Sequence, residues 1–232
     1  MASDGLTDAR RRIGAAAERS GRDPGSVRLV VVSKGQSDEA VRTLYEAGHR
    51  VFAENRADSL VARRQGDLPT DITWHFVGTV QRRRARTIAA NSELLHSMDR
   101  DRLEATWAGL LPEAPPVLLQ INLAEEPQKQ GYHRDDVFAA ADRLSELGVV
   151  VRGLMVLPPT PRKSEDSRRW FTELAELGHA LRADHPGARE LSMGMTDDFE
   201  VAVECGSTMV RLGRAIFGAR DEGKRIDSGQ QD

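Results

Sequence analysis

A lysine at the end of an apolar segment is the residue best placed for covalent chemistry in this sequence. Lys34 follows directly after 29–33 (LVVVS), which is typical of a buried strand. In parallel β/α barrels the active site is built at the carboxyl ends of the strands, and a primary amine there can form an imine with a carbonyl compound. On position alone, a solvated lysine that opens a loop is the favoured explanation, because most lysines at strand ends face water.

Two glycine-containing turns near the end of the sequence are suited to binding a phosphate. The first holds Gly194 between the hydroxyl residues Ser192 and Thr196, and the second holds Gly213 and Arg214. Barrels that bind phosphorylated ligands commonly hold the phosphate after strands seven and eight, because glycines let the backbone approach and helix N-termini present N–H groups. Each glycine alone could serve only to permit a turn.

An arginine in the last apolar segment is expected to point into the barrel. Arg211 lies between Val210 and Leu212, and strand alternation turns it inward when these two neighbours face outward. An inward arginine needs an acceptor, which is either a protein carboxylate or a ligand atom such as a ring nitrogen. An amine, a phosphate site and an arginine together suggest a phosphorylated aldehyde, and pyridoxal 5'-phosphate (PLP) fits that description.

Short apolar segments alternate with amphipathic segments through the whole sequence. The expected strands are 28–33, 50–53, 73–77, 94–97, 117–122, 149–155, 190–193 and 208–212, and the expected helices include 6–20, 37–47, 134–147 and 165–183. Eight strands alternating with helices, in a length near the roughly 250 residues typical of that architecture, predict an α/β fold with a single (β/α)8 (TIM) barrel. An open doubly wound sheet is the alternative.

The composition is that of a soluble globular protein with one domain. Hydrophobic residues make up 39% and charged residues 30% of the 232 residues, with a net charge of -3. We expect the barrel to occupy 1–220 and the polar segment 221–232 to be a disordered tail. Without a signal sequence or an apolar run of about 20 residues, a cytoplasmic protein with no membrane partner is expected. Cys205 is the only cysteine, so no disulfide within the chain and no metal site is expected.

Several strings of this sequence, in order, resemble the pyridoxal phosphate homeostasis protein family. They are VVSK at 31–34, FAEN at 52–55, WHFVG at 74–78, QIN at 120–122, RGLM at 152–155, LSMGM at 191–195, GSTMVRLG at 206–213 and IFG at 216–218. The resemblance runs from about residue 6 to 220. It implies a single barrel like the N-terminal domain of alanine racemase, with PLP bound as an imine of Lys34.

The resemblance also implies roles for the remaining candidate residues. It places Asn55 beside the cofactor ring, Arg211 against the pyridine nitrogen, and the following groups around the phosphate: Ser192, Gly194, Thr196 and the backbone of Gly213 and Arg214. An arginine that donates to the ring nitrogen discourages its protonation, because a guanidinium stays charged. This weakens the ring as an electron sink, and a weak electron sink suits a carrier.

The function implied is therefore that of a PLP-binding protein that maintains intracellular PLP homeostasis as a carrier or buffer. Its partners would be PLP and, transiently, apo forms of PLP-dependent enzymes, and we expect a monomer. A PLP-dependent amino-acid racemase is the first alternative, and it requires an acid/base residue opposite Lys34. A PLP-independent, aldolase-like barrel that uses Lys34 is the second. Whether the protein turns over a substrate stays open.

The sequence departs from the family pattern at several positions near the expected site. Ala53 replaces a glycine, Asp58 stands where glutamine is common, and 80–84 (VQRRR) replaces Leu-Gln-x-Asn-Lys, which puts Arg83 in place of the asparagine. Arg84 could supply the charge of the missing lysine.

Two arginine clusters and one lysine outside the expected site each have a functional and a structural explanation. The arginines of 10–12 and 82–86 could contact nucleic acid, but the negative net charge favours solvated helix faces and no nucleic-acid partner. Lys129 could be a second PLP site, although a loop ion pair with Glu125 or Glu126 is favoured.

Overall fold

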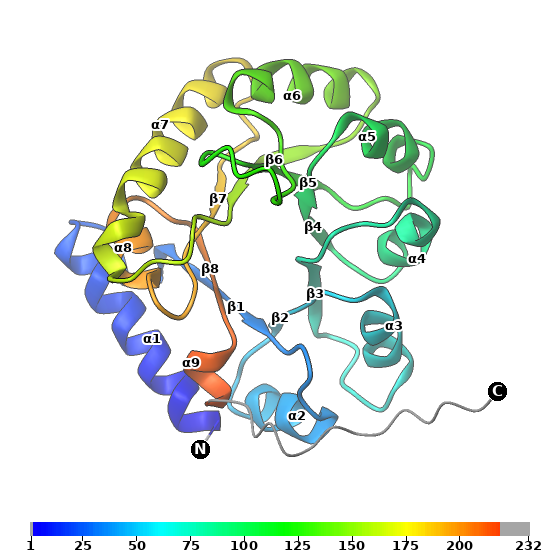
Figure 1. Cartoon of the computed structure of the whole chain (residues 1–232). Helices are drawn as coiled ribbons and strands as arrows, with labels where there is room; N and C mark the ends of the chain where they lie inside the picture. The colour runs from blue at the N-terminus through cyan, green and yellow to red at the C-terminus, as the bar shows by residue number, and fades with distance from the viewer. Residues whose placement is uncertain (1, 219–232) are drawn as a thin grey trace.

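A closed barrel of parallel strands forms the centre of the molecule (Figure 1). The computed structural model describes residues 2–218, and the expected polar tail, 221–232, lies outside the described residues. The strands follow one another around the barrel in sequence order, and β8 pairs with β1. Their bounds are β1 (Arg28–Val32), β2 (Val51–Glu54), β3 (Thr73–Phe76), β4 (Leu94–Met98), β5 (Val117–Ile121), β6 (Val151–Val156), β7 (Glu190–Ser192) and β8 (Met209–Leu212). The predicted (β/α)8 barrel is confirmed, and the open sheet is excluded.

Helices surround the barrel on the outside, as Figure 1 shows. They are α1 (Ala2–Arg19), α2 (Asp38–Glu46), α3 (Ala57–Gln65), α4 (Ala85–Ala89), α5 (Asp101–Ala108), α6 (Val137–Glu146), α7 (Arg168–Asp184), α8 (Phe199–Glu204) and α9 (Arg214–Phe217). Short 3-10 turns are η1 (Pro24–Ser26), η2 (Arg82–Arg84), η3 (Arg134–Asp136) and η4 (Ser164–Ser167). The leading helix α1 packs against α8 and α9, so it covers the barrel where the last helices are short.

The apolar core has two layers, which follow from the alternation of side chains along each strand. The larger layer lies between strands and helices and holds the bulky residues such as Trp74, Trp107 and Phe171. The smaller layer fills the barrel interior with Val30, Ala53, Leu94, Leu118, Met155 and Met209. On β8, Met209 belongs to the interior, and Val210 and Leu212 belong to the outer layer. Arg211 must therefore point inward, as the sequence predicts.

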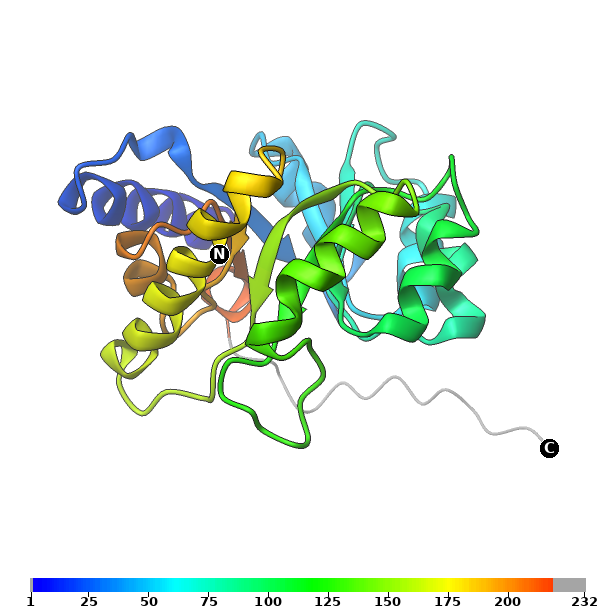
Figure 2. The same cartoon turned by 90° about the horizontal axis from the view of Figure 1, so that it is seen from above.

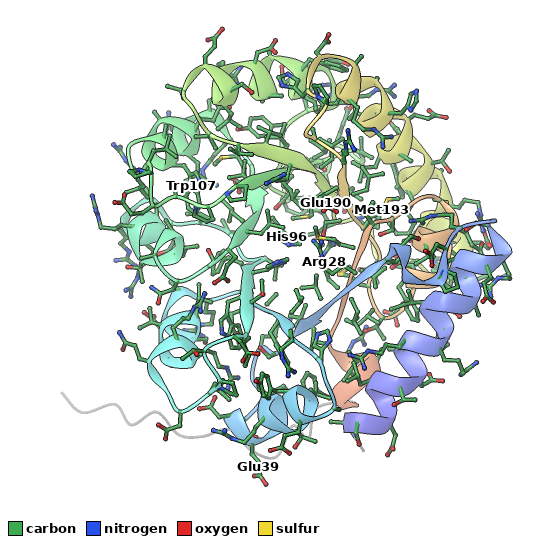
Figure 3. All side chains as sticks on the ribbon, turned by 180° about the vertical axis from the view of Figure 1, so that it is seen from behind. Arg28, Glu39, His96, Trp107, Glu190 and Met193 are labelled. Atoms are coloured by element: carbon green, nitrogen blue, oxygen red, sulfur yellow. The ribbon has the colours of Figure 1, made fainter. Side chains whose placement is uncertain are left out.

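The two ends of the barrel differ. Figure 2 shows the segments that follow β5 and β6 extending beyond the end to which the β6 arrow points. At the opposite end, seen from behind in Figure 3, Arg28 and Glu190 lie within the ring of strands, with Arg28 Nη1 3.5 Å from Glu190 Oε1. Of the helices in the described residues, none has the length and apolar character needed to cross a membrane.

Candidate functional site

A pocket of about 670 Å³ opens at the carboxyl ends of the strands. This volume lies within the usual range for small-molecule sites. Its lining comes from six of the eight strands or the turns after them: Val32, Lys34, Asn55, Val77, Gly78, Thr79, Met155, Leu157, Met195, Thr196, Asp197, Arg211, Gly213 and Arg214. The structure thus brings together all the predicted site residues except Ser192 and Gly194.

Lys34 lies in an exposed turn directly after β1. Its side chain lines the pocket, and within residues 2–218 no hydrogen bond or ion pair engages its ammonium group. The apolar residues Val32 and Met155 contribute to the same pocket, so the amine stands at the edge of a partly apolar site. This arrangement leaves the amine available to a carbonyl group bound beside it.

Buried charged residues hold the turn that carries Lys34. Ser33 Oγ donates to Glu54 Oε1 at 2.8 Å, and Arg63 Nε lies 3.3 Å from the same oxygen. Arg63 Nη2 also donates to the carbonyl of Gln36 at 2.6 Å. Because Arg63 and Glu54 come from α3 and the end of β2, two neighbouring elements fix the backbone on both sides of Lys34.

The end of β2 and the turn after β3 approach each other closely at the pocket. A Cβ atom added to Gly78 would lie 2.0 Å from the carbonyl oxygen of Asn55 and 2.7 Å from its carbonyl carbon. Only glycine permits this contact between two backbones, which real Cβ atoms do not allow. The contact places Asn55 in the pocket wall beside Gly78 and Thr79.

The turn after β7 is joined to the start of α9. Thr196 Oγ1 accepts a hydrogen bond from the backbone N–H of Ala215 at 3.3 Å, and Asp197 pairs with Arg214 at 2.7 Å. A Cβ atom on Gly213 would lie 3.1 Å from the Val32 carbonyl oxygen, so glycine lets the start of α9 lie close to β1. The turns after β7 and β8 therefore form one side of the pocket.

Gly194 serves the packing of α8 in this structure. Its φ is +96°, a conformation that favours glycine, and an added Cβ would lie 2.6 Å from Ala202 Cβ. Its carbonyl accepts from the backbone N–H of Arg211 at 3.0 Å. Gly194 permits the turn that carries Thr196 and does not itself line the pocket.

Arg211 presents its guanidinium at the inner end of the pocket. The residue is only 4% exposed, and its Nη1 donates to Ser192 O at 2.7 Å and to Ser192 Oγ at 2.6 Å. Its Nη2 donates to Val156 O at 2.9 Å. Burial lowers the pKa of Arg211 to about 10, so it is charged at neutral pH. The Nε–H and the second Nη2–H have no protein acceptor within residues 2–218.

Ser192 differs from its expected position at the phosphate. Its hydroxyl lies inside the barrel, with His96 Nδ1 at 2.9 Å and Arg211 Nη1 at 2.6 Å. Its neighbours Leu191 and Met193 belong to the outer core layer, so alternation turns Ser192 inward, below the turn.

Two histidines, His96 and His75, continue this contact across the barrel. His96 Nε2 lies 2.9 Å from His75 Nδ1, and both rings are buried. Burial lowers the pKa of His75 to about 3 and that of His96 well below its usual range. His96 carries no sequence signal of its own, because its contact with Ser192 joins residues 96 positions apart.

Two of the departures from the family pattern pair with each other at the entrance. Arg84 Nη2 lies 3.1 Å from Asp58 Oδ1, and both side chains line a smaller pocket that shares Asn55 and Thr79 with the main one. Lys129 forms the expected loop ion pair with Glu126, and its Nζ also donates to Pro158 O at 3.0 Å.

Comparisons with known proteins show which family this chain resembles. The family model described as alanine racemase, N-terminal domain, matches residues 9–221. A pyridoxal phosphate homeostasis protein of Vibrio alginolyticus is 38% identical over 88% of this chain and 91% of that protein. The one of Escherichia coli K12 is 36% identical over 95% and 97%.

A solved structure that contains PLP is also similar to this chain. The structure of PipY of Synechococcus elongatus PCC7942 with PLP bound is 32% identical, with a TM-score of 0.79 over 94% of this chain and 100% of that one. From the family model, the relatives and the fold, we conclude that the chain belongs to the pyridoxal phosphate homeostasis protein family, whose barrel is that of the alanine racemase N-terminal domain.

Proposed function

We propose that this protein binds PLP in the main pocket through Lys34 and acts as a carrier or buffer that maintains PLP homeostasis in the cytoplasm. One observation carries the proposal: within residues 2–218, the Lys34 amine has no partner and the buried Arg211 has two N–H groups without an acceptor, and both residues line the same pocket. The PLP named in the PipY structure and the name of the relatives support it.

The residues present fit the chemistry of PLP. When bound, PLP supplies an aldehyde that reacts reversibly with amines and an aromatic ring that can withdraw electrons. Lys34 would hold the aldehyde end by a covalent bond to Nζ. Thr196, Gly213 and Arg214 would hold the phosphate through a hydroxyl, backbone N–H groups and a positive charge. Val32 and Met155 offer apolar surface to the ring.

Arg211 would set the protonation state of the ring nitrogen. Its two free N–H groups can donate to a ring nitrogen, and a guanidinium has no lone pair with which to accept a proton in return. The ring nitrogen would therefore stay unprotonated, which reduces electron withdrawal from bonds next to the bound amine. This property favours storage of PLP over catalysis of amino-acid chemistry.

The pocket also gives a reason to prefer a carrier over a racemase. Its ionisable lining residues are Lys34, Asp197, Arg211 and Arg214, and Asp197 is paired with Arg214. A racemase needs a second acid/base group opposite the lysine, and none of these supplies one. The exposed position of Lys34 lets an incoming amine reach it, which suits release to apo PLP-dependent enzymes. We also propose that the protein is a monomer, because a single barrel forms the whole pocket.

Two assays on one preparation test this function. Protein incubated with PLP and freed of excess by gel filtration should restore activity to an apo PLP-dependent enzyme. The same preparation should not racemise enantiopure alanine faster than the Lys34→Ala variant. Racemisation that depends on Lys34 would overturn the carrier proposal, and failure to retain PLP at all would overturn PLP binding.

A further inference from the structure

A chain of four buried polar side chains crosses the barrel interior at the inner end of the pocket. Arg211 on β8 contacts Ser192 on β7 at 2.6 Å, Ser192 contacts His96 on β4 at 2.9 Å, and His96 contacts His75 on β3 at 2.9 Å. None of the four is more than 4% exposed. Figure 3 shows His96 within the ring of strands. Four separate strands thus contribute to one hydrogen-bonded row that ends at a pocket residue.

The chemistry of arginine gives this row a direction. A guanidinium can only donate, so the Ser192 oxygen accepts from Arg211. The Ser192 hydroxyl can then donate its own proton to His96 Nδ1, which requires this nitrogen to be unprotonated. In that arrangement His96 carries its proton on Nε2 and donates it to His75 Nδ1, and His75 carries its own proton on Nε2. This assignment satisfies every polar atom between Arg211 and His75 with a partner.

The surroundings keep both imidazoles neutral, as this direction requires. Burial is the largest cause that lowers the pKa of each histidine, and the positive charge of Arg28 lowers both further. Arg211 acts on His96 in the same sense, and so does His75. The negative charge of Asp198 favours the charged form of Arg211, and Glu190 lies 3.5 Å from Arg28.

The row accounts for the orientation of Arg211. Nη1 is fully used by the oxygen atoms of Ser192, and one Nη2 hydrogen is used by Val156 O. The guanidinium plane is therefore fixed, and the two remaining N–H groups lie along one edge of it. We propose that Ser192, His96 and His75 are positioning residues that fix the Arg211 guanidinium and aim its free edge at a ring-nitrogen acceptor in the pocket. The identity of that acceptor rests on the proposed function, whereas the state of the row does not.

The first experiment compares PLP affinity in matched variants. Ser192→Ala and His96→Phe should weaken PLP binding by about 10- to 100-fold, because an arginine that loses a fixed partner presents its donors less often. His96→Asn should recover much of the affinity, since its amide oxygen can accept from Ser192 where Nδ1 did. Ser92→Ala is the control: Ser92 is also buried, but it donates to Ile88 O at the end of α4.

A spectroscopic readout separates positioning from a role in folding alone. The absorbance band of bound PLP should shift in Ser192→Ala and His96→Phe and not in Ser92→Ala, because only the first two change the donor at the ring nitrogen. Wild-type affinity and an unshifted band in folded Ser192→Ala and His96→Phe would overturn the proposal.

A second measurement needs no PLP and keeps the test decisive if a variant fails to fold. Nitrogen-15 NMR of the wild-type protein without cofactor should show His96 and His75 as neutral Nε2–H tautomers, unchanged between about pH 5 and 8. A His96 ring protonated at Nδ1 would overturn the direction of the row. If the tautomers are as expected and PLP does not bind, the proposed function fails and the assignment of the row stands.

Discussion

The Oγ atom of Ser192 lies 2.6 Å from Nη1 of Arg211, inside the barrel and below the turn after β7. A hydroxyl expected at the phosphate is therefore hydrogen-bonded to Arg211 inside the barrel. Thr196, Gly213 and Arg214, which we propose hold the phosphate, line the pocket together because the turns after β7 and β8 meet there. The phosphate and the ring nitrogen of the proposed ligand would therefore contact residues from different layers of the barrel.

The buried ion pair of Arg63 and Glu54, next to the turn that carries Lys34, can be tested by its effect on stability. Replacing Arg63 by methionine should lower the free energy of unfolding by about 3 to 5 kcal/mol, because it leaves the Glu54 carboxylate buried without its charge partner. The two side chains are 9% and 1% exposed, so solvent cannot replace the lost partner. Urea denaturation measures the change.

The matched control for this prediction is Arg84→Met. Arg84 and Asp58 form an ion pair with side chains 43% and 66% exposed, and such pairs contribute at most about 1 kcal/mol. Equal losses in the two variants would show that Arg63 and Glu54 do not act as a buried pair.

Gly78→Ala tests the close backbone contact at the pocket wall. The added Cβ would lie 2.0 Å from the Asn55 carbonyl oxygen, so one of the two backbones must move. We expect the free energy of unfolding to fall by at least about 1 to 3 kcal/mol, with weaker PLP binding because Asn55 is displaced. Gly187→Ala, where no atom lies within 4 Å of the added Cβ, should change stability by less than about 0.5 kcal/mol. A stable Gly78→Ala protein with normal PLP affinity would contradict the contact.

Buried histidines should make the protein less stable as the pH falls. Burial lowers the pKa of His49 to about 4, and the positive charges of Arg10 and Arg50 act in the same direction. Between about pH 6.5 and the folded pKa, the unfolded chain binds a proton that the folded protein does not. The free energy of unfolding should therefore fall by about 1.4 kcal/mol per pH unit for each such histidine as the pH is lowered. His75 acts in the same sense.

The variant His49→Gln isolates one of these contributions. Its unfolding free energy, measured in urea at several pH values, should depend on pH with a slope smaller by about one proton. His179→Gln is the control, because His179 is exposed on α7. An unchanged slope in His49→Gln would mean that His49 is protonated in the folded state.

Most of the fold could be predicted from local patterns. The expected helix at 37–47 corresponds to α2, Asp38–Glu46, and the Ser37 side chain accepts from Ala40 N at 3.2 Å to cap it. The expected strand at 149–155 begins later, at Val151, because Val149 N donates to Leu144 O at 2.8 Å and so still belongs to the turn that follows α6. Apolar residues alone could not show where the turn ends and the strand begins.

The site could be predicted in part for the same reason. Lys34, Thr196 and Arg211 follow from their positions at strand ends or on one face of a strand, which are local properties. The contact of His96 with Ser192 joins β4 to β7 across the barrel, and its existence depends on barrel geometry that no local pattern specifies. Strand alternation alone is enough to predict that Ser192 points inward. Its position beside a glycine turn indicates a phosphate contact instead, and the two local signals conflict.

The absorbance spectrum of the protein after incubation with PLP and gel filtration tests the central claim most directly. Wild-type protein should retain a visible band from covalently bound PLP, Lys129→Ala should retain it too, and Lys34→Ala should lose it. A band of equal strength in Lys34→Ala, or no band in the wild type, would contradict the assignment of Lys34 as the residue that holds PLP.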